Sequence, residues 1–192
     1  MSVRAEPLRI ARPNGWWGMA AFVATEATLF GVLFGSYFYL RFQTPTWPPD
    51  GIAAPKTALP LILAGVLAAT SVPMALAYAA ARRGRRGLGW LSVCAAFVVQ
   101  SLYLAVQLHQ FNADLAKFGP DKNAYASIYY TLLGADHAHV LVGLLLDAWL
   151  LVRLSTGLTR YRLVGLRTIA FYWYAVSVLT LLVTACVLSA RA

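Results

Sequence analysis

Charged residues are scarce in this sequence, and acidic ones are the scarcest. Only 12% of the 192 residues are charged, and Asp and Glu together number 7. Hydrophobic residues make up 60% of the chain, and the mean hydropathy is +0.64. A soluble domain of this length has no core large enough to bury so much apolar surface. The composition therefore excludes a soluble globular protein and indicates a polytopic membrane protein.

Cysteine is also rare, and its placement gives no sign of a disulfide. Cys94 and Cys186 both fall in long apolar stretches, where a lone thiol packs as a small apolar side chain. A cleavable signal peptide is not evident either. Residues 1–15, MSVRAEPLRIARPNG, are basic and contain proline but lack an apolar run, so we expect a short exposed tail.

The apolar residues are collected in long uninterrupted blocks. A helix needs roughly 20 apolar residues to cross a bilayer, and about five blocks meet that length. Alternation of apolar and polar residues, which a membrane strand requires, is missing from them. We therefore predict an all-α domain over residues 16–192, a bundle of five transmembrane helices. The predicted helices are 16–40, 57–81, 88–110, 126–152 and 168–190.

Basic residues gather on one side of this predicted bundle. Eleven of the 16 Lys and Arg residues lie in the tail, in the loop near residue 84 and in the loop near residue 160. Because basic loops remain in the cytoplasm, we expect a cytoplasmic N-terminus and, after five crossings, a periplasmic C-terminus. The net charge of +9 is thus a topology signal, and we expect no nucleic-acid partner.

The longer loops fall on the opposite side. The first contains PTWPPDGIAAPK, in which Trp47, Pro48 and Pro49 fix a surface shape without regular structure. We predict that this loop faces a partner protein.

The first apolar block carries small residues at every fourth position. Ala27, Gly31 and Gly35 form a ridge on one helix face, which allows another helix to approach closely. The spacing predicts association and leaves open whether the second helix belongs to this chain or to a neighbouring subunit.

Ionisable residues inside the apolar blocks are few. Each costs roughly 2.5 to 3.5 kcal/mol at a helix centre, so each needs a compensating contact. Glu26 lies in the first block, and the fourth contains GADHAHVLVGLLLDAW. In that segment a single helical stripe carries Asp136, His139, Gly143 and Asp147, whereas His137 points away.

The depth of Glu26 suggests a partner in this stripe. Gly143 allows a second helix to come close, and Glu26 lies at a level bracketed by His139 and Asp147. We predict a buried polar network in which Glu26 is hydrogen-bonded to His139. Two roles are open, a polar clamp between helices and a proton-conducting site, and one carboxylate with one histidine does not make a relay.

The same histidines do not predict a metal site. His137 and His139 are two positions apart, whereas helical ligands of one metal favour a spacing of four. The remaining His109 supplies no paired axial ligand for haem. We expect no catalytic residue, metal or cofactor in this chain.

The residues quoted above carry a family resemblance. The run WWGMAAFVATEATLFGVLFGSYFYLRF, followed by WPPDGI, GADHAHVLVG and FYWYAVSVLTLLV, resembles subunit III of the haem-copper respiratory oxidases. The resemblance covers nearly the whole chain from Trp16 onward. It implies a redox-silent subunit in a bacterial inner membrane, packed against catalytic subunit I, which holds the haems and copper, with subunit II and phospholipid as further partners.

The resemblance also assigns residues. This chain looks like the short form of subunit III, which lacks the first two of seven helices. Glu26 matches the buried glutamate of the family. In the motif of the fourth helix, Gly134 matches the leading glycine and His139 matches the second histidine. Asp136 replaces the first histidine of that motif, and Tyr174 and Ser177 stand where a histidine and an aspartate are usual. The implied role is to stabilise subunit I and to support proton uptake and sustained turnover.

Two alternatives remain at this point. The first alternative, suggested by the departures from the family pattern, is a subunit III homologue that accompanies a nitric oxide reductase. A small independent transporter or proton channel is the other, although the sequence offers no internal repeat of the kind that transporters carry.

Overall fold

Every element of the described structure is helical. The computed structural model describes residues 14–49, 51–157 and 159–191, and no strand occurs among them. The elements are α1 (Asn14–Gln43), α2 (Ala58–Ala69), α3 (Ser71–Arg82), α4 (Arg86–Leu115), α5 (Ala124–Ser155), α6 (Arg160–Leu188) and the 3₁₀ turn η1 (Ser189–Arg191). Of the predicted tail, residues 1–13 lie outside this description, while Asn14 and Gly15 already belong to α1.

The prediction of an all-α protein with five membrane spans is confirmed. Among the described residues, five helical segments are long and apolar enough to cross a membrane, with α2 and α3 together forming one of them, over Ala58–Arg82. The helices extend past the apolar blocks, most clearly in α6, which begins at Arg160 instead of residue 168. The side chain of Thr159 caps that end by accepting a hydrogen bond from the backbone N–H of Arg162 at 3.3 Å.

The second predicted helix is interrupted in the middle. Pro73 has no N–H to donate to the carbonyl of Ala69, and its ring crowds that carbonyl. At the break, the backbone N–H of Thr70 donates to Leu67 O at 3.1 Å, which is a 3₁₀ contact, and its hydroxyl donates to the same carbonyl at 2.7 Å. The interruption thus places Thr70, a buried polar residue, inside the bundle.

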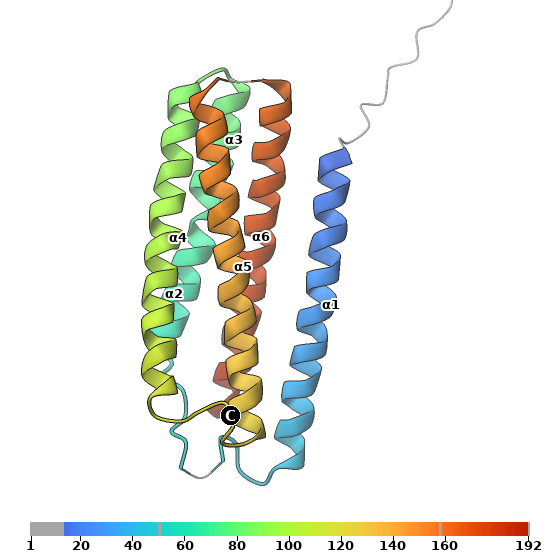
Figure 1. The fold of residues 1–192 in the computed structure, drawn as a ribbon, viewed down its shortest axis with the longest axis vertical. Coiled ribbons are helices and arrows are strands. Elements are labelled where there is room, and N and C mark those ends of the chain that lie inside the picture. The colour runs from blue at the N-terminus through green and yellow to red at the C-terminus, as the bar shows by residue number, and fades with distance from the viewer. Residues whose placement is uncertain (1–13, 50, 158, 192) are drawn as a thin grey trace, which may run out of the picture.

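Helix α6 is the centre of the bundle, and α1 is at its edge. Helix α6 contacts α1, α2, α3 and α5, whereas α1 contacts only α5 and α6 among the described helices. In the most apolar part of α6, half of the residues are buried inside the bundle, whereas in the most apolar part of α1 only 6% are. Figure 1 shows α1 standing to one side of the other helices. Contacts that hold α1 to the bundle are therefore few and identifiable.

Both arginine-rich turns lie at the same end of the bundle. The α3–α4 turn and the α5–α6 connection meet at the upper end of Figure 1. Gly84, in the first of these turns, has a φ of +73°, a backbone conformation that glycine adopts without strain. The charge pattern requires both arginine-rich turns to lie on one side of the membrane. The fold places both turns at one end of the bundle, as this requires.

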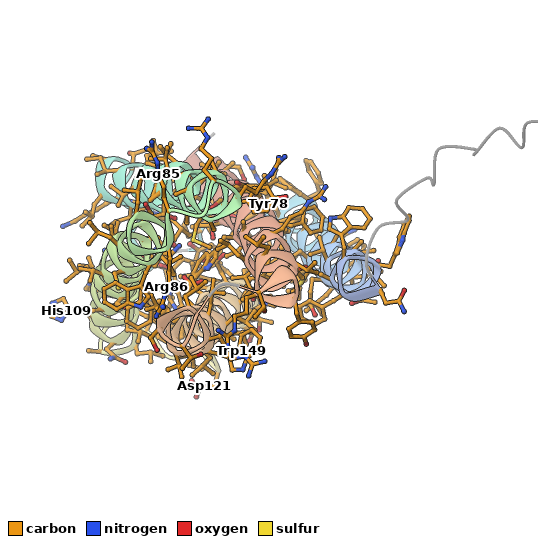
Figure 2. All side chains as sticks on the ribbon, turned by 90° about the horizontal axis from the view of Figure 1, so that it is seen from above. Tyr78, Arg85, Arg86, His109, Asp121 and Trp149 are labelled. Carbon is orange, nitrogen blue, oxygen red and sulfur yellow. The ribbon has the colours of Figure 1, made fainter. Side chains whose placement is uncertain are left out.

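Arg86 joins the two turns directly. Its Nε donates to the carbonyl of Leu154 at 2.8 Å, and its Nη2 donates to the carbonyl of Ser155. These carbonyls end α5, where the helix has no donors of its own and its dipole favours a cation. Viewed from this end, Figure 2 shows Arg86 between α4 and α5.

Candidate functional site

The polar contact that links α1 to α5 is made by Glu26 and His139. Oε2 of Glu26 lies 2.7 Å from Nε2 of His139, and both side chains are mostly buried, with 19% and 14% of their surface exposed. The other ring nitrogen, Nδ1, lies 2.6 Å from the carbonyl oxygen of Ala135, one turn earlier on α5. The ring of His139 is thus held from both sides.

These two contacts define how many protons the pair carries. A carbonyl oxygen only accepts, so Nδ1 of His139 must donate to Ala135. The contact between Nε2 and Glu26 then requires one further proton, which resides either on the imidazole or on the carboxyl group. The pair therefore has no net charge in either arrangement, and this suits a site inside a membrane span.

Aromatic side chains surround the pair. The ring of Phe30, one turn along α1 from Glu26, lies 5.2 Å from the imidazole centroid in an edge-on arrangement. From α6, the hydroxyl of Tyr172 donates to the carbonyl oxygen of His139 at 2.7 Å. Three helices, α1, α5 and α6, therefore meet at His139.

A second polar group lies between α4, α5 and α6. The hydroxyl of Thr180 donates to Oδ1 of Asp136 at 2.7 Å, and both residues are buried. Tyr103 of α4 also interacts with Asp136 and accepts a hydrogen bond from Gln107 at 3.0 Å. The carboxyl group of Asp136 is thus held by the hydroxyl of Thr180 from α6 and lies beside Tyr103 of α4.

A third polar group is centred on Asp147, which is fully buried. The amide of Gln100 lies between Asp147 and Thr70. With its nitrogen toward the carboxylate it donates to Oδ2 of Asp147 at 2.9 Å and to the carbonyl of Ala96 at 3.1 Å. Its oxygen then faces the hydroxyl of Thr70 at 3.1 Å. This group connects α2, α4 and α5 through side chains.

Gly143 lies between these groups and is matched to Trp173 of α6. A Cβ on Gly143 would lie 2.5 Å from Cζ2 of the indole, which is well inside van der Waals contact. The glycine therefore admits an aromatic ring from α6, which is fully buried in this position.

The predicted site residues are thus arranged as three separate groups. Glu26 meets His139, whereas Asp136 and Asp147 are hydrogen-bonded to side chains of other helices, and neither is hydrogen-bonded to Glu26 among the described residues. Glu26 is also less buried than the sequence predicts, because α1 is at the edge of the bundle.

Sequence reasoning missed Thr70 and Arg86. The only signal for Thr70 was the nearby Pro73, and Arg86 was taken as a topology signal alone.

His137 and the other candidate metal ligands do not assemble. The ring of His137 faces α4, with its centroid 5.4 Å from that of Phe111. Within residues 14–49, 51–157 and 159–191, no three His, Cys, Asp or Glu side chains are grouped so that they could hold a metal ion. That this chain holds no metal or cofactor stays a prediction, and we assign it no step through one.

The two predicted contact surfaces differ in their accessibility. Ala27, Gly31 and Gly35 are exposed on α1, and a Cβ added to either glycine would meet nothing within 4 Å. In the loop, by contrast, Trp47 is turned inward. Its Nε1 donates to the hydroxyl of Tyr37 at 3.0 Å, and its ring packs edge-on against Tyr125 at 4.9 Å. Pro48 and Pro49 follow it and are half-buried. That this loop faces a partner stays a prediction.

Comparison with protein families decides what this bundle is. The family model described as "Cytochrome c oxidase subunit III" matches residues 12–188. The chain belongs to the cytochrome c oxidase subunit III family. This subunit III chain therefore carries the family signature across all five spans, including the α1 and α5 segments that hold Glu26 and His139.

Individual relatives agree with this assignment. The subunit III chain is 30% identical to cytochrome c oxidase subunit 3 of Synechocystis, over 84% of its own length and 70% of the relative's. It is 27% identical to cytochrome bo(3) ubiquinol oxidase subunit 3 of Pseudomonas aeruginosa, over 84% of its length and 78% of the relative's. A third relative, haem-copper oxidase subunit I+III of Aeropyrum pernix, is 29% identical over 86% of this chain, which spans only 21% of that protein. These relatives are named as oxidase subunits, so neither the reductase-associated homologue nor the transporter is favoured.

Proposed function

We propose that this chain is a redox-silent subunit of a terminal haem-copper oxidase, which packs against catalytic subunit I and stabilises it. The family match across residues 12–188 is the observation that carries the proposal. Support for the partner comes from the Aeropyrum relative, whose name joins subunits I and III in one protein. In this proposal the haems and copper belong to subunit I, and subunit II is a further partner of the complex.

The structure of this chain supports a scaffolding role over a catalytic one. Its polar groups connect helices in pairs and threes, and the described residues offer no metal-binding cluster. We assign the exposed face of α1, with Ala27, Gly31 and Gly35, to contact with another membrane helix. The Glu26–His139 pair would hold α1 in the position that such a contact requires.

The proposed setting is a bacterial inner membrane, with the N-terminus in the cytoplasm. Both arginine-rich turns lie at one end of the bundle, and the bias of basic residues toward the cytoplasm supports this orientation. The arginine-rich end then lies on the side from which an oxidase takes up protons. We propose that the subunit supports proton uptake and sustained turnover from this side, with bound phospholipid.

Isolation of the tagged chain from its own membranes in mild detergent tests this proposal. We expect haem-containing chains to be recovered with it, with an optical haem spectrum and oxygen consumption that a mock isolation lacks. Nitric oxide reduction without oxygen consumption would identify the reductase-associated homologue instead. A colourless chain that stays folded alone would contradict the subunit assignment.

Deletion of the chain tests the role within the complex. We expect the remaining oxidase to keep its haem spectrum and its initial rate but to lose activity faster during turnover. Equal persistence of activity with and without the chain would contradict the stabilising role. Loss of the haem spectrum on deletion would contradict a redox-silent role and show that the chain is needed for cofactor insertion.

A further inference from the structure

A cavity opens at the arginine-rich end of the bundle, among α1, α3 and α6. Its volume is about 180 Å³. The walls come from the first turn of α1, the last two turns of α3 and the first turns of α6. The lining residues are Trp16, Tyr78, Arg82, Leu163, Val164, Arg167 and Thr168. In the end-on view of Figure 2, Tyr78 lies on the side of α3 toward α6.

Two arginines give this cavity a positive charge that the described protein does not neutralise. Arg82 and Arg167 line it from opposite helices, α3 and α6. The acidic residues of the described structure lie in other places, namely Glu26, Asp114, Asp121, Asp136 and Asp147. The contacts between acidic and basic side chains among the described residues, Lys117–Asp114 and His139–Glu26, involve neither arginine. Both side chains are exposed, with Arg82 lying over the ring of Tyr78 at 5.8 Å, so the two guanidinium groups are available to an anion from outside the described chain.

The other walls suit an amphiphilic ligand. The hydroxyl oxygen of Thr168 is buried in the wall of the cavity and has no hydrogen-bond partner among the described residues. Trp16 and Tyr78 are aromatic residues at the end of the membrane spans, the level at which lipid headgroups lie. Leu163 and Val164 add apolar wall that an acyl chain can follow toward the hydrocarbon.

We infer that this cavity binds the phosphate group of an anionic phospholipid, held by Arg82 and Arg167. Guanidinium groups bind phosphate through paired N–H donors, and basic pockets between helix ends on the cytoplasmic side bind lipid headgroups. The site lies between α1, α3 and α6 of this chain. The inference rests on the phospholipid binding in the proposed function and names its site, and the binding is measured on this chain whatever the chain assembles with.

Native mass spectrometry of the purified protein tests the inference. Phosphatidylglycerol, phosphatidylcholine of equal chain length and inorganic phosphate are titrated separately, and bound molecules are counted. We expect one tightly bound phosphatidylglycerol. A cation near a lipid surface contributes about 1 kcal/mol, or about fivefold in affinity. The Arg82→Gln/Arg167→Gln variant should therefore bind phosphatidylglycerol about 25-fold more weakly.

A matched pair of variants controls for general charge. Arg83→Gln/Arg85→Gln removes the same charge at the same end, and these two residues line a separate cavity between α3 and α4 instead of this one. Equal weakening by both pairs would overturn the site, as would equal binding of phosphatidylcholine. Binding of inorganic phosphate as tight as that of phosphatidylglycerol would overturn the lipid assignment. The Arg82→Lys/Arg167→Lys variant, which keeps both charges, controls for misfolding, and we expect it to retain most of the binding.

Discussion

Trp173 of α6 occupies the space that Gly143 of α5 leaves free. Because a Cβ at residue 143 would lie 2.5 Å from the indole, the close approach of α5 and α6 depends on the absence of a side chain there. Gly134, about two and a half helical turns earlier on α5, is also a glycine, but a Cβ at that residue would meet nothing within 4 Å. The two glycines therefore offer a matched comparison on one helix.

We expect Gly143→Ala to destabilise the protein by about 1–3 kcal/mol, because the methyl group overpacks the contact with Trp173. Gly134→Ala should be neutral or stabilising by up to about 1 kcal/mol, since alanine favours the helix more than glycine does. Unfolding of the purified variants in mixed detergent measures both effects. A loss of stability at residue 134 as large as that at residue 143 would show that general helix effects, not the indole contact, decide the outcome.

The contact between Glu26 and His139 predicts different results for two substitutions. Glu26→Gln keeps a donor toward Nε2 of His139, and we expect unfolding free energy and assembly within about 0.5 kcal/mol of the native chain. Glu26→Leu leaves Nε2 unpaired, and we expect a loss of about 1–2 kcal/mol together with looser attachment of α1.

Thr28→Leu provides the control for the first helix, because Thr28 is exposed and its hydroxyl bonds only to Ala24 O of its own helix. Protease sensitivity of the connection after α1 and recovery of the complex are the measurements. Unimpaired assembly and turnover in both Glu26 variants would rule out the polar clamp.

Asp147 and Gln100 should behave as a coupled pair. Asp147→Leu leaves the Gln100 amide without its carboxylate, and Gln100→Leu leaves the carboxylate without its donor. Each single change should destabilise the protein by about 1–3 kcal/mol, and the double change should cost less than the sum, because no buried polar group is then left unpaired. A double-mutant cycle by detergent unfolding tests this. Strict additivity would mean that the two side chains do not interact.

Arg86 should stabilise the end of α5 through geometry as well as charge. We expect Arg86→Ala to destabilise the protein by about 1–2 kcal/mol, because two carbonyls at the α5 end lose a charged donor. Arg86→Lys keeps the charge but offers a single compact donor group, so an intermediate loss is expected. Hydrogen exchange of the last turn of α5 reports the effect directly. Arg83→Ala, an exposed neighbour of equal charge, should leave that exchange unchanged.

The sequence predicts the spans well because hydropathy responds to burial in lipid. Helix ends depend on different interactions, which explains the errors at the ends. The apolar block near residue 168 begins where the arginines stop, whereas α6 continues outward to Arg160 because Thr159 caps it. The break at Thr70 was predictable from Pro73, since a proline inside a helical pattern interrupts it.

The polar contacts are only partly readable from one sequence. Depth and helical stripe bring Glu26 and His139 to one level, and the structure places them in contact. The same reasoning does not say which helices are neighbours in the bundle. Because α5 packs against both α4 and α6, Asp136 meets Thr180 of α6 and Asp147 meets Gln100 of α4. The partner of the small-residue ridge on α1 could not be predicted, because the sequence of one chain contains no information on a second protein that covers this ridge.

The distance in sequence between Glu26 and its partner has a consequence for biosynthesis. His139 follows it by 113 residues, and a ribosome adding 5–20 residues per second needs roughly 6–23 s to make that stretch. Throughout this interval α1 is already synthesised while its carboxyl group still has no imidazole to meet. We expect the nascent span to stay beside the translocation channel or an insertion factor until α5 arrives, so that release of the first helix into lipid is timed by the fourth crossing.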